Sequence, residues 1–248
     1  MKRTRLLWIL TLCLGISGVA LTSCSDDDNN DYDPTYLPNA IVTVKPVAAT
    51  DSFYMQLDDS TTLSADNMKT SPYGKKEVRA FTNIQEIKKI GTTGRHYLVH
   101  VNWMDSILTK NMAADKGDAN VQTYRQDPVE VMRNWTVSED GYLTMQVATR
   151  WGGSARHIVN LVNTGKDGKY EVTFFHDAKG ETFGQWDTSV VAFRLDQLPD
   201  TKGQTVDLTL KWMSYSGEKS ATFKYCTRKS SQISTTAISA SGNERVIQ

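Results

Sequence analysis

Apolar residues in this chain recur at every second position, not at the three- and four-residue spacing of a helix, and this alternation constrains the fold most. In residues 52–57 it places Phe53, Met55 and Leu57 on one face, as in a half-buried strand. Residues 97–103 combine the same alternation with strand-forming Val, Tyr and Trp. The pattern predicts an all-β protein.

The first half of the chain is expected to form a small barrel. Its predicted strands cover residues 41–44, 52–57, 77–84 and 97–103, and the last continues through 104–108. A short helix around residues 82–89 is the helical candidate. About five curled, antiparallel strands with one short helix favour an OB-like barrel over residues 39–113.

The second half alternates more regularly and predicts an antiparallel β-sandwich over residues 126–230. Its expected strands cover residues 129–137, 142–150, 157–163, 170–176, 189–195, 205–213 and 220–227. Gly141 supplies the left-handed conformation of a tight turn after residues 138–140. The polar stretch 109–127, which ends in Asp127-Pro128, is the expected boundary between the halves.

Residues 1–23 are predicted to form a lipoprotein signal peptide. Lys2, Arg3 and Arg5 precede an apolar stretch, and Leu21-Thr-Ser-Cys24 resembles a bacterial lipobox. A membrane-spanning helix is the alternative, but the apolar stretch is shorter than the roughly 20 residues that a bilayer requires. We therefore expect cleavage before Cys24 and a covalent lipid on it, with no other cofactor.

An acidic tether over residues 24–38 follows the lipidation site. Ser25, Asp26, Asp27 and Asp28 form an acidic run that cannot bury apolar surface and is expected to be solvated. The run also resembles the export signal of Bacteroidetes lipoproteins, which implies an outer-membrane location facing the exterior. A calcium loop would need a glycine turn and a distal glutamate, which the run lacks.

Charge and cysteine content exclude two further classes of protein. Removal of residues 1–23 takes Lys plus Arg from 28 to 25 against 28 acidic residues, so the mature chain carries about −3. No basic patch indicates nucleic-acid binding. After lipidation of Cys24, Cys226 has no partner for a disulfide and is expected to be a small buried residue. The Ser- and Thr-rich stretch 231–248 is expected to be a flexible tail.

No residue pattern in the sequence predicts an enzyme or a metal site. His96 and His100 would lie about 13 Å apart on a strand, too far to share an ion. His157 and His176 could pair, but no third ligand is evident. Gly152-Gly-Ser154 lacks the second glycine of a nucleophile elbow. We predict no catalytic and no metal-binding residue.

Tryptophans are the strongest binding candidates in the mature chain. Trp103, Trp135 and Trp212 lie in predicted strands and are expected in the core. Trp151 precedes two glycines, and Trp186 lies in the loop-like stretch 184–188. These two are the predicted ligand-binding residues, with Arg150 and Arg156 nearby for polar contacts.

The order of these segments resembles the NigD-like lipoproteins of Bacteroides and its relatives. The segments that carry the resemblance are Cys24-Ser-Asp-Asp-Asp28, residues 52–59, Arg79-Ala-Phe81, residues 99–103 with 106–110, residues 135–143, residues 157–161 and residues 206–212. The resemblance implies an N-terminal OB-like domain, a C-terminal β-sandwich and an association with bacteriocin immunity. It implies no catalytic or ligand residues.

Three functions remain open on the sequence alone. The first is a surface lipoprotein that binds an incoming toxin, or masks the receptor of that toxin, without catalysis. The second is a surface module that binds glycans through Trp151 and Trp186. The third is an accessory subunit of an outer-membrane complex. All three place the protein on a membrane through its lipid.

Overall fold

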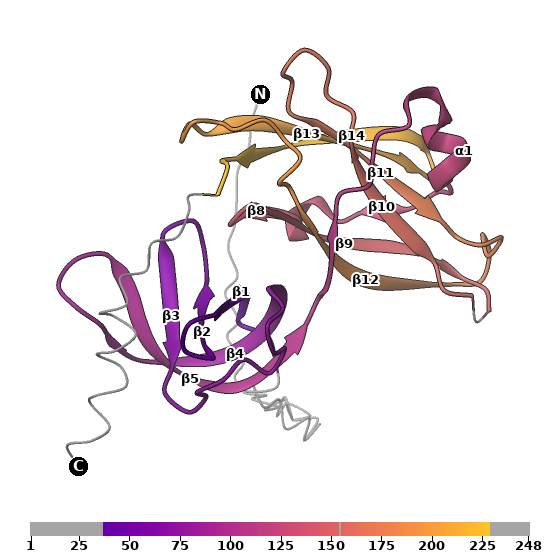
Figure 1. The fold of residues 1–248 in the computed structure, drawn as a ribbon. Coiled ribbons are helices and arrows are strands. Elements are labelled where there is room, and N and C mark those ends of the chain that lie inside the picture. Colours follow the sequence, from indigo (N-terminus) through magenta and orange to yellow (C-terminus); the bar gives the residue numbers. More distant parts are fainter. Residues whose placement is uncertain (1–36, 154, 229–248) are drawn as a thin grey trace, which may run out of the picture. The chain divides into compact units, whose positions relative to one another are not determined.

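The first domain is a closed five-stranded barrel (Figure 1). The computed structural model describes residues 37–153 and 155–228. The barrel strands are β1 (Ala40–Val47), β2 (Ser52–Gln56), β3 (Thr61–Ala65), β4 (Val78–Lys89) and β5 (Arg95–Ser106), in the order β1-β2-β3-β5-β4. This confirms the OB-like barrel. The expectation of purely antiparallel pairing was wrong at one place, because β3 and β5 are parallel.

Alternation along the strands fills the interior of the barrel. The buried side chains there are Val42, Val44, Phe53, Met55, Leu63, Ala80, Val99 and Val101. They come from all five strands, as the period of two requires. The outward-facing residues between them are free to form other contacts.

The expected helix at residues 82–89 was wrong, because these residues form the second half of β4. Thr82 donates its hydroxyl to the Trp103 carbonyl oxygen on β5 at 2.9 Å. The strand also carries two register irregularities, one of them between Glu86 and Lys88. Such a bulge interrupts strict alternation and can make a strand look helical in sequence.

The second domain contains two sheets, as the sandwich prediction requires. One sheet has the order β10 (Ile158–Asn163), β11 (Glu171–Asp177), β13 (Val206–Ser214) and β14 (Gly217–Tyr225). The other has the order β6 (Leu108–Asn111), β12 (Gln185–Arg194), β9 (Tyr142–Trp151) and β7 (Glu130–Val131), with β8 (Val137–Glu139) paired to β9. Pairing is mostly antiparallel, but β11 with β13 and β6 with β12 are parallel.

The stretch predicted as a linker contains ordered elements. β6 pairs with β12, so these residues lie in the sandwich and not in the barrel domain predicted over 39–113. A 3₁₀ turn, η2 (Gly117–Ala119), leads into the helix α1 (Asn120–Tyr124). Asp115 accepts hydrogen bonds from Gly117 N and Asn120 Nδ2 and orders this turn. Side chain-to-backbone bonds of this kind order a polar stretch that has no apolar period.

The single strand expected over residues 129–137 is broken. β7 ends at Val131, the 3₁₀ turn η3 (Arg133–Trp135) follows, and β8 begins at Val137. As a result Trp135 is 40% exposed and not in the core, although its ring packs edge-on against Phe81 at 5.8 Å.

The core of the sandwich lies between its two sheets. It contains Leu143, Met145, Val147, Leu161, Val172, Phe174, Val191, Phe193, Leu208, Leu210 and Trp212, among others. The prediction of a buried Trp212 is confirmed. Within the described part of the chain, no helix has the length and apolarity needed to cross a bilayer.

Candidate functional site

Trp186 presents an exposed aromatic surface on the outer face of β12. Its position alternates with Val191 and Phe193, which face the core, so its indole points away from the core. The residue is 48% exposed. It lies in strand β12, and the loop predicted for this position was wrong. Trp186 is paired with Arg150 on β9, and the Arg150 guanidinium lies 5.0 Å from the indole centroid.

Tyr215 completes this surface from the turn between β13 and β14. Its ring lies 4.8 Å from that of Trp186. Its hydroxyl accepts a hydrogen bond from Arg150 N at 3.1 Å and lies 3.0 Å from Thr149 Oγ1. Glu130 also accepts a hydrogen bond from Tyr215 N. These bonds fix the ring, and we call Arg150, Trp186 and Tyr215 the aromatic surface.

Trp151 lies on the opposite face of β9, at the end of the sandwich interior. Its indole stacks on the His157 imidazole at 3.9 Å with an interplanar angle of 17°. Its Nε1 is buried with no partner among the described residues. Of the two predicted ligand-binding tryptophans, the structure therefore exposes Trp186 and packs Trp151 inward. The two do not form one platform, and Arg156 is exposed.

His157 and His176 form the expected pair behind Trp151. His157 Nδ1 lies 3.0 Å from His176 Nε2. His176 Nδ1 faces two acceptors, the carbonyl oxygens of Asp127 at 3.3 Å and Pro128 at 3.2 Å, so this nitrogen carries the proton. His176 Nε2 then accepts a hydrogen bond from His157 Nδ1. His157 Nε2 lies 3.8 Å from a Glu181 carboxylate oxygen.

Glu181 connects the two loops at this end of the sandwich. Its carboxylate accepts hydrogen bonds from Gly153 N at 3.0 Å and Ala155 N at 2.8 Å. The bond from Ala155 is the largest of several that lower the pKa of this carboxyl. A side chain at Gly153 would overlap the same carboxylate, since its Cβ would lie 2.6 Å from Glu181 Oε1. A larger residue at 153 would therefore require the flexible Glu181 side chain to shift.

Acidification is expected to destabilise the protein through its buried histidines. Burial, followed by the nearby charge of His157, lowers the pKa of His176, and burial also lowers the pKa of His96. A histidine with a lowered folded-state pKa contributes stability that is complete above its unfolded pKa of about 6.5 and is lost as the pH falls below it. Urea unfolding at pH 7, 6 and 5 should show a declining free energy, with a shallower decline in His176→Gln and in His96→Gln. A free energy that is independent of pH over this range would contradict the expectation.

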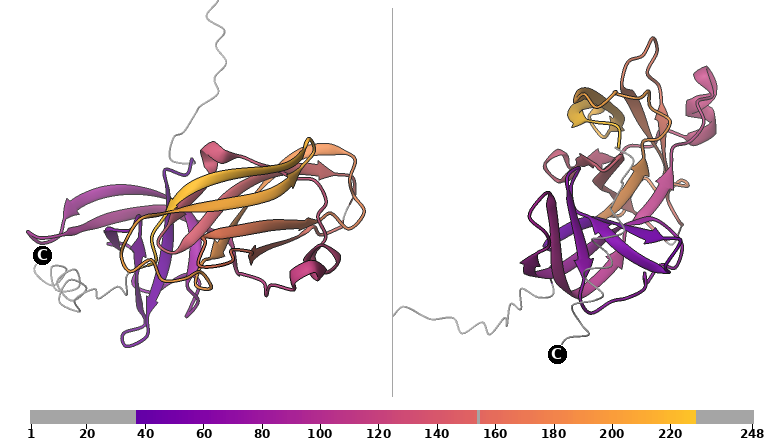
Figure 2. Two further views of the ribbon diagram at one scale, coloured as in Figure 1. Left: turned by 90° about the horizontal axis from the view of Figure 1, so that it is seen from above. Right: turned by 60° about the vertical axis from the view of Figure 1, so that its left-hand side comes forward.

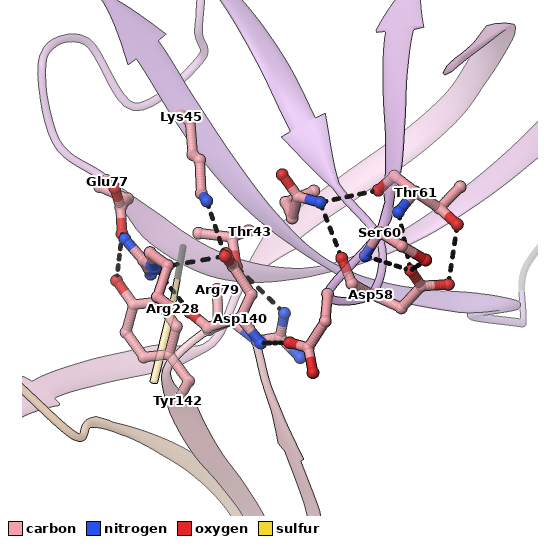
Figure 3. Close-up of polar contacts among 12 residues, drawn as sticks. Thr43, Lys45, Asp58, Ser60, Thr61, Glu77, Arg79, Asp140, Tyr142 and Arg228 are labelled. Atoms are coloured by element: carbon pink, nitrogen blue, oxygen red, sulfur yellow. Dashed lines mark hydrogen bonds and ion pairs between the residues drawn. The ribbon is translucent and has the colours of Figure 1, made fainter. Parts of the chain in front are cut away.

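A buried polar junction joins the barrel to the sandwich (Figure 3). Lys45 on β1 contacts Asp140, in the turn between β8 and β9, at 2.7 Å, and their side chains are only 6% and 4% exposed. Asp140 N donates to Asp59 at 2.7 Å. Asp58 orders the turn that carries Asp59, because its carboxylate accepts bonds from the backbone N–H groups of Ser60 and Thr61.

Glu77 and Tyr142 form the second part of this junction. Tyr142 donates its hydroxyl to Glu77 at 2.7 Å, and Arg228 Nη1 donates to the same carboxylate oxygen at 2.7 Å. Burial raises the pKa of Tyr142 to about 12, and the bond to Glu77 acts in the same direction. Burial would raise the pKa of Glu77, but its bonds to Tyr142 and Arg228 lower it overall.

Arg79 crosses the junction from β4 and is fully buried. It donates to Thr43 Oγ1 at 3.1 Å within the barrel and to Thr144 Oγ1 at 3.2 Å on the sandwich. Its guanidinium lies 3.6 Å from the Glu139 carboxylate. Burial lowers the pKa of Arg79, and the charge of Glu139 opposes this. The junction is a charge-compensated structural contact between the domains.

The remaining predicted sites have different outcomes. Within residues 37–153 and 155–228, no three metal-ligating side chains converge. Cys226, expected to be a small buried residue, is a free cysteine that is half-buried. Cys24, the acidic run at residues 25–28 and the tail at 231–248 lie outside the described residues.

Sequence reasoning missed Tyr215 and Glu181. Tyr215 stands in a turn, where an aromatic residue is unusual, and that position was the available signal. No sequence signal connects Glu181 with the loop 152–155, because the contact depends on two connections between the sheets that meet only in the folded sandwich.

Family models match both domains of the chain. The NigD-like N-terminal OB domain matches residues 41–107, and the NigD-like C-terminal beta sandwich domain matches residues 111–225. The chain belongs to the NigD-like family. The resemblance inferred from the order of segments is thereby confirmed, and the match to the N-terminal OB domain ends at residue 107, before β6 begins.

Solved structures of similar proteins support the same fold. A candidate toxin-related protein from Parabacteroides distasonis is 30% identical, with a TM-score of 0.63 over 82% of this chain and 97% of that chain. A protein of unknown function from Bacteroides vulgatus is 20% identical, with a TM-score of 0.61 over 75% of this chain and 89% of the other. A NigD-like immunity protein from Bacteroides caccae is 20% identical, with a TM-score of 0.52 over 74% and 90%. A search of curated proteins finds no significant match.

Proposed function

We propose that this NigD-like protein is a non-catalytic, lipid-anchored lipoprotein of the outer membrane, facing the exterior, that binds a proteinaceous toxin and protects the cell. The observation that carries the binding role is the exposed aromatic surface of Arg150, Trp186 and Tyr215. Tryptophan, tyrosine and arginine are the residues that most often dominate the energy of protein–protein interfaces. Because the Tyr215 ring is already immobilised, it loses little conformational entropy on binding.

Membership of the family supports the choice of partner. Its similar structures include a protein described as toxin-related and one described as an immunity protein. The lipobox-like Leu21-Thr-Ser-Cys24 supports the tether, since a lipid on Cys24 would concentrate the binder where a secreted toxin arrives.

A toxin-challenge assay tests the proposed function. A deletion strain and its parent are exposed to toxins secreted by sibling strains, and the deletion strain is complemented with wild-type protein or with Cys24→Ser. We expect survival to be lost on deletion, restored by the wild-type protein and not by Cys24→Ser, which should leave the membrane fraction. Equal survival of parent and deletion strain across a broad panel would overturn immunity, and co-purification with an outer-membrane protein would then favour an accessory subunit.

Substitution of Trp186 is expected to weaken toxin binding without unfolding the protein. Truncating a central interface residue commonly costs about 2 kcal/mol, so Trp186→Ala should weaken the affinity roughly 30-fold. Val121→Ala removes a side chain that is also about half exposed, on α1, and serves as the matched control. Titration calorimetry with a toxin found in the challenge assay measures both variants. An unchanged affinity in Trp186→Ala would show that the toxin binds elsewhere.

Glycan binding is a second candidate because the exposed Trp186 ring could stack on a sugar, with Arg150 beside it for polar contacts. Affinity electrophoresis in polysaccharide gels distinguishes this candidate, since retention should be lost in Trp186→Ala. Trp151→Ala is not a test of either function, because Trp151 packs on His157 inside the sandwich end.

A further inference from the structure

The β4–β5 hairpin extends beyond the barrel as an exposed arm. We define the arm as residues 85–95 (Figure 2, left). In the arm β4 has passed its last pairing with β1, at Thr82, whereas β5 is still paired with β3 at Arg95. Every residue of the arm except Ile90 is exposed. The arm therefore projects more side chains into solvent than barrel closure requires.

Ile87 lies at a bulge in this arm. Glu86 is paired with Val99 and Lys88 with Leu98, so Ile87 is the extra residue of β4. A bulge turns a side chain away from the regular alternation. Ile87 is 49% exposed and directly precedes Lys88 and Lys89.

The charge of the arm is opposite to that of the mature chain. The arm contains three basic residues, Lys88, Lys89 and Arg95, and one acidic residue, Glu86. The mature chain as a whole is acidic. Arg95 lies 3.6 Å from the Asp58 carboxylate, so part of its charge is compensated. The lysine pair next to Ile87 gives the arm a basic and apolar composition, which suits the interface of an anionic membrane.

The tether joins the barrel at the base of this arm. Asn39 exchanges two hydrogen bonds with the backbone of Ile84, and Asn83 donates to the Leu37 carbonyl oxygen at 2.8 Å. Ile84 directly precedes the arm. Leu37 lies thirteen positions after Cys24, so the lipid lies within about 45 Å of the arm's base.

We propose that the arm contacts the lipid headgroups of the anionic membrane that holds the chain, with Ile87 inserted and Lys88 and Lys89 against the lipid phosphates. This inference rests on the lipid anchor of the proposed function, but not on toxin binding. It commits to lipid phosphate as the partner. The length of the tether, its point of attachment and the charge of the arm all support this partner.

A fluorescence experiment on tethered protein tests the arm. The chain from Ser25 onward, with an N-terminal histidine tag, is held on nickel-chelating vesicles, so the test does not require native acylation. Cys226→Ser and Thr92→Cys allow a polarity-sensitive probe to be attached at the tip of the arm. Quenching by spin-labelled lipid should be about twofold stronger on vesicles with phosphatidylglycerol than on phosphatidylcholine alone.

Charge variants decide whether the arm is responsible. Lys88→Glu with Lys89→Glu should abolish the difference between the two vesicles, and Ile87→Asn should reduce the quenching on both. Lys166→Glu with Lys169→Glu, in the exposed turn between β10 and β11, is the matched control and should leave the quenching unchanged. Equal quenching on both vesicles, or quenching that persists after charge reversal in the arm, would overturn the proposal.

The acidic tether is the competing occupant of the arm. In one outcome, replacing Asp26, Asp27 and Asp28 by asparagine changes the probe signal in solution, and adding vesicles causes no further change in that signal. The arm then binds the tether, and the proposed membrane contact is overturned. Failure of the lipid anchor is a separate result. It would appear as wild-type protein in the soluble fraction of cells, whatever the probe reports on nickel-chelating vesicles.

Discussion

Asp140→Asn is expected to lower the free energy of unfolding by about 3–5 kcal/mol, because it leaves the buried Lys45 ammonium without a counter-ion. The substitution preserves the shape of the side chain. It also suits the backbone, since Asp140 has a φ of 49° and asparagine tolerates the left-handed region. Burial already lowers the pKa of Lys45, and the charge and hydrogen bond of Asp140 oppose that shift. Urea unfolding at pH 7 measures the loss.

Two further variants separate a buried ion pair from a general effect of charge. Asp207→Asn breaks the Lys224–Asp207 pair at 2.6 Å, which is largely exposed, and should cost less than about 1 kcal/mol. Lys45→Met combined with Asp140→Asn should be less destabilised than the sum of the single variants, because no unpaired charge stays buried. A loss in Asp140→Asn no larger than in Asp207→Asn would show that the junction is hydrated.

Gly184→Ala is expected to be the most damaging substitution near the aromatic surface, at about 3–4 kcal/mol. Gly184 has a φ of 108°, and a Cβ there would lie 2.1 Å from the Trp151 carbonyl oxygen and 2.6 Å from Gly152 Cα. The overlap is with backbone, so no rotamer change relieves it. The Gly184 carbonyl also accepts a hydrogen bond from Arg150, and its displacement should alter the Trp186 fluorescence.

Gly180→Ala is the matched control for that prediction. Gly180 also has a positive φ, 85°, but a Cβ there would have no neighbour within 4 Å. Only the backbone strain remains, at about 1 kcal/mol. Chemical denaturation measures the loss in free energy of unfolding for both variants. Equal losses would mean that the backbone at Trp151 and Gly184 moves apart to accommodate the added Cβ.

Much of the fold follows from local sequence. The strand β13 has a strict apolar period, which specifies both the strand and the face that it buries. The secondary-structure prediction was wrong where a bulge or a polar segment interrupts the apolar alternation. Residues 82–89 looked helical because of a bulge, and the helix α1 has no apolar face that a period could reveal.

Pairing and burial were beyond local reasoning at the candidate sites. Trp151 and Trp186 are equally plausible surface residues in sequence, yet opposite parity in the two paired strands turns one inward and the other outward. The junction of Lys45, Arg79 and Asp140 joins segments 34 to 95 residues apart in sequence. Its members look like ordinary solvated charges until both domains exclude water from them.

The sequence by itself determined the all-β class, the division into a barrel and a sandwich, and membership of the NigD-like family, because alternation and segment order are local properties of the chain. Only the tertiary structure decided that Arg150, Trp186 and Tyr215 form one surface, and that an arm carrying Ile87 begins where the tether attaches. The physical reason is that strand register and hairpin docking set these contacts. Both depend on which distant faces are buried together, and no short segment specifies that.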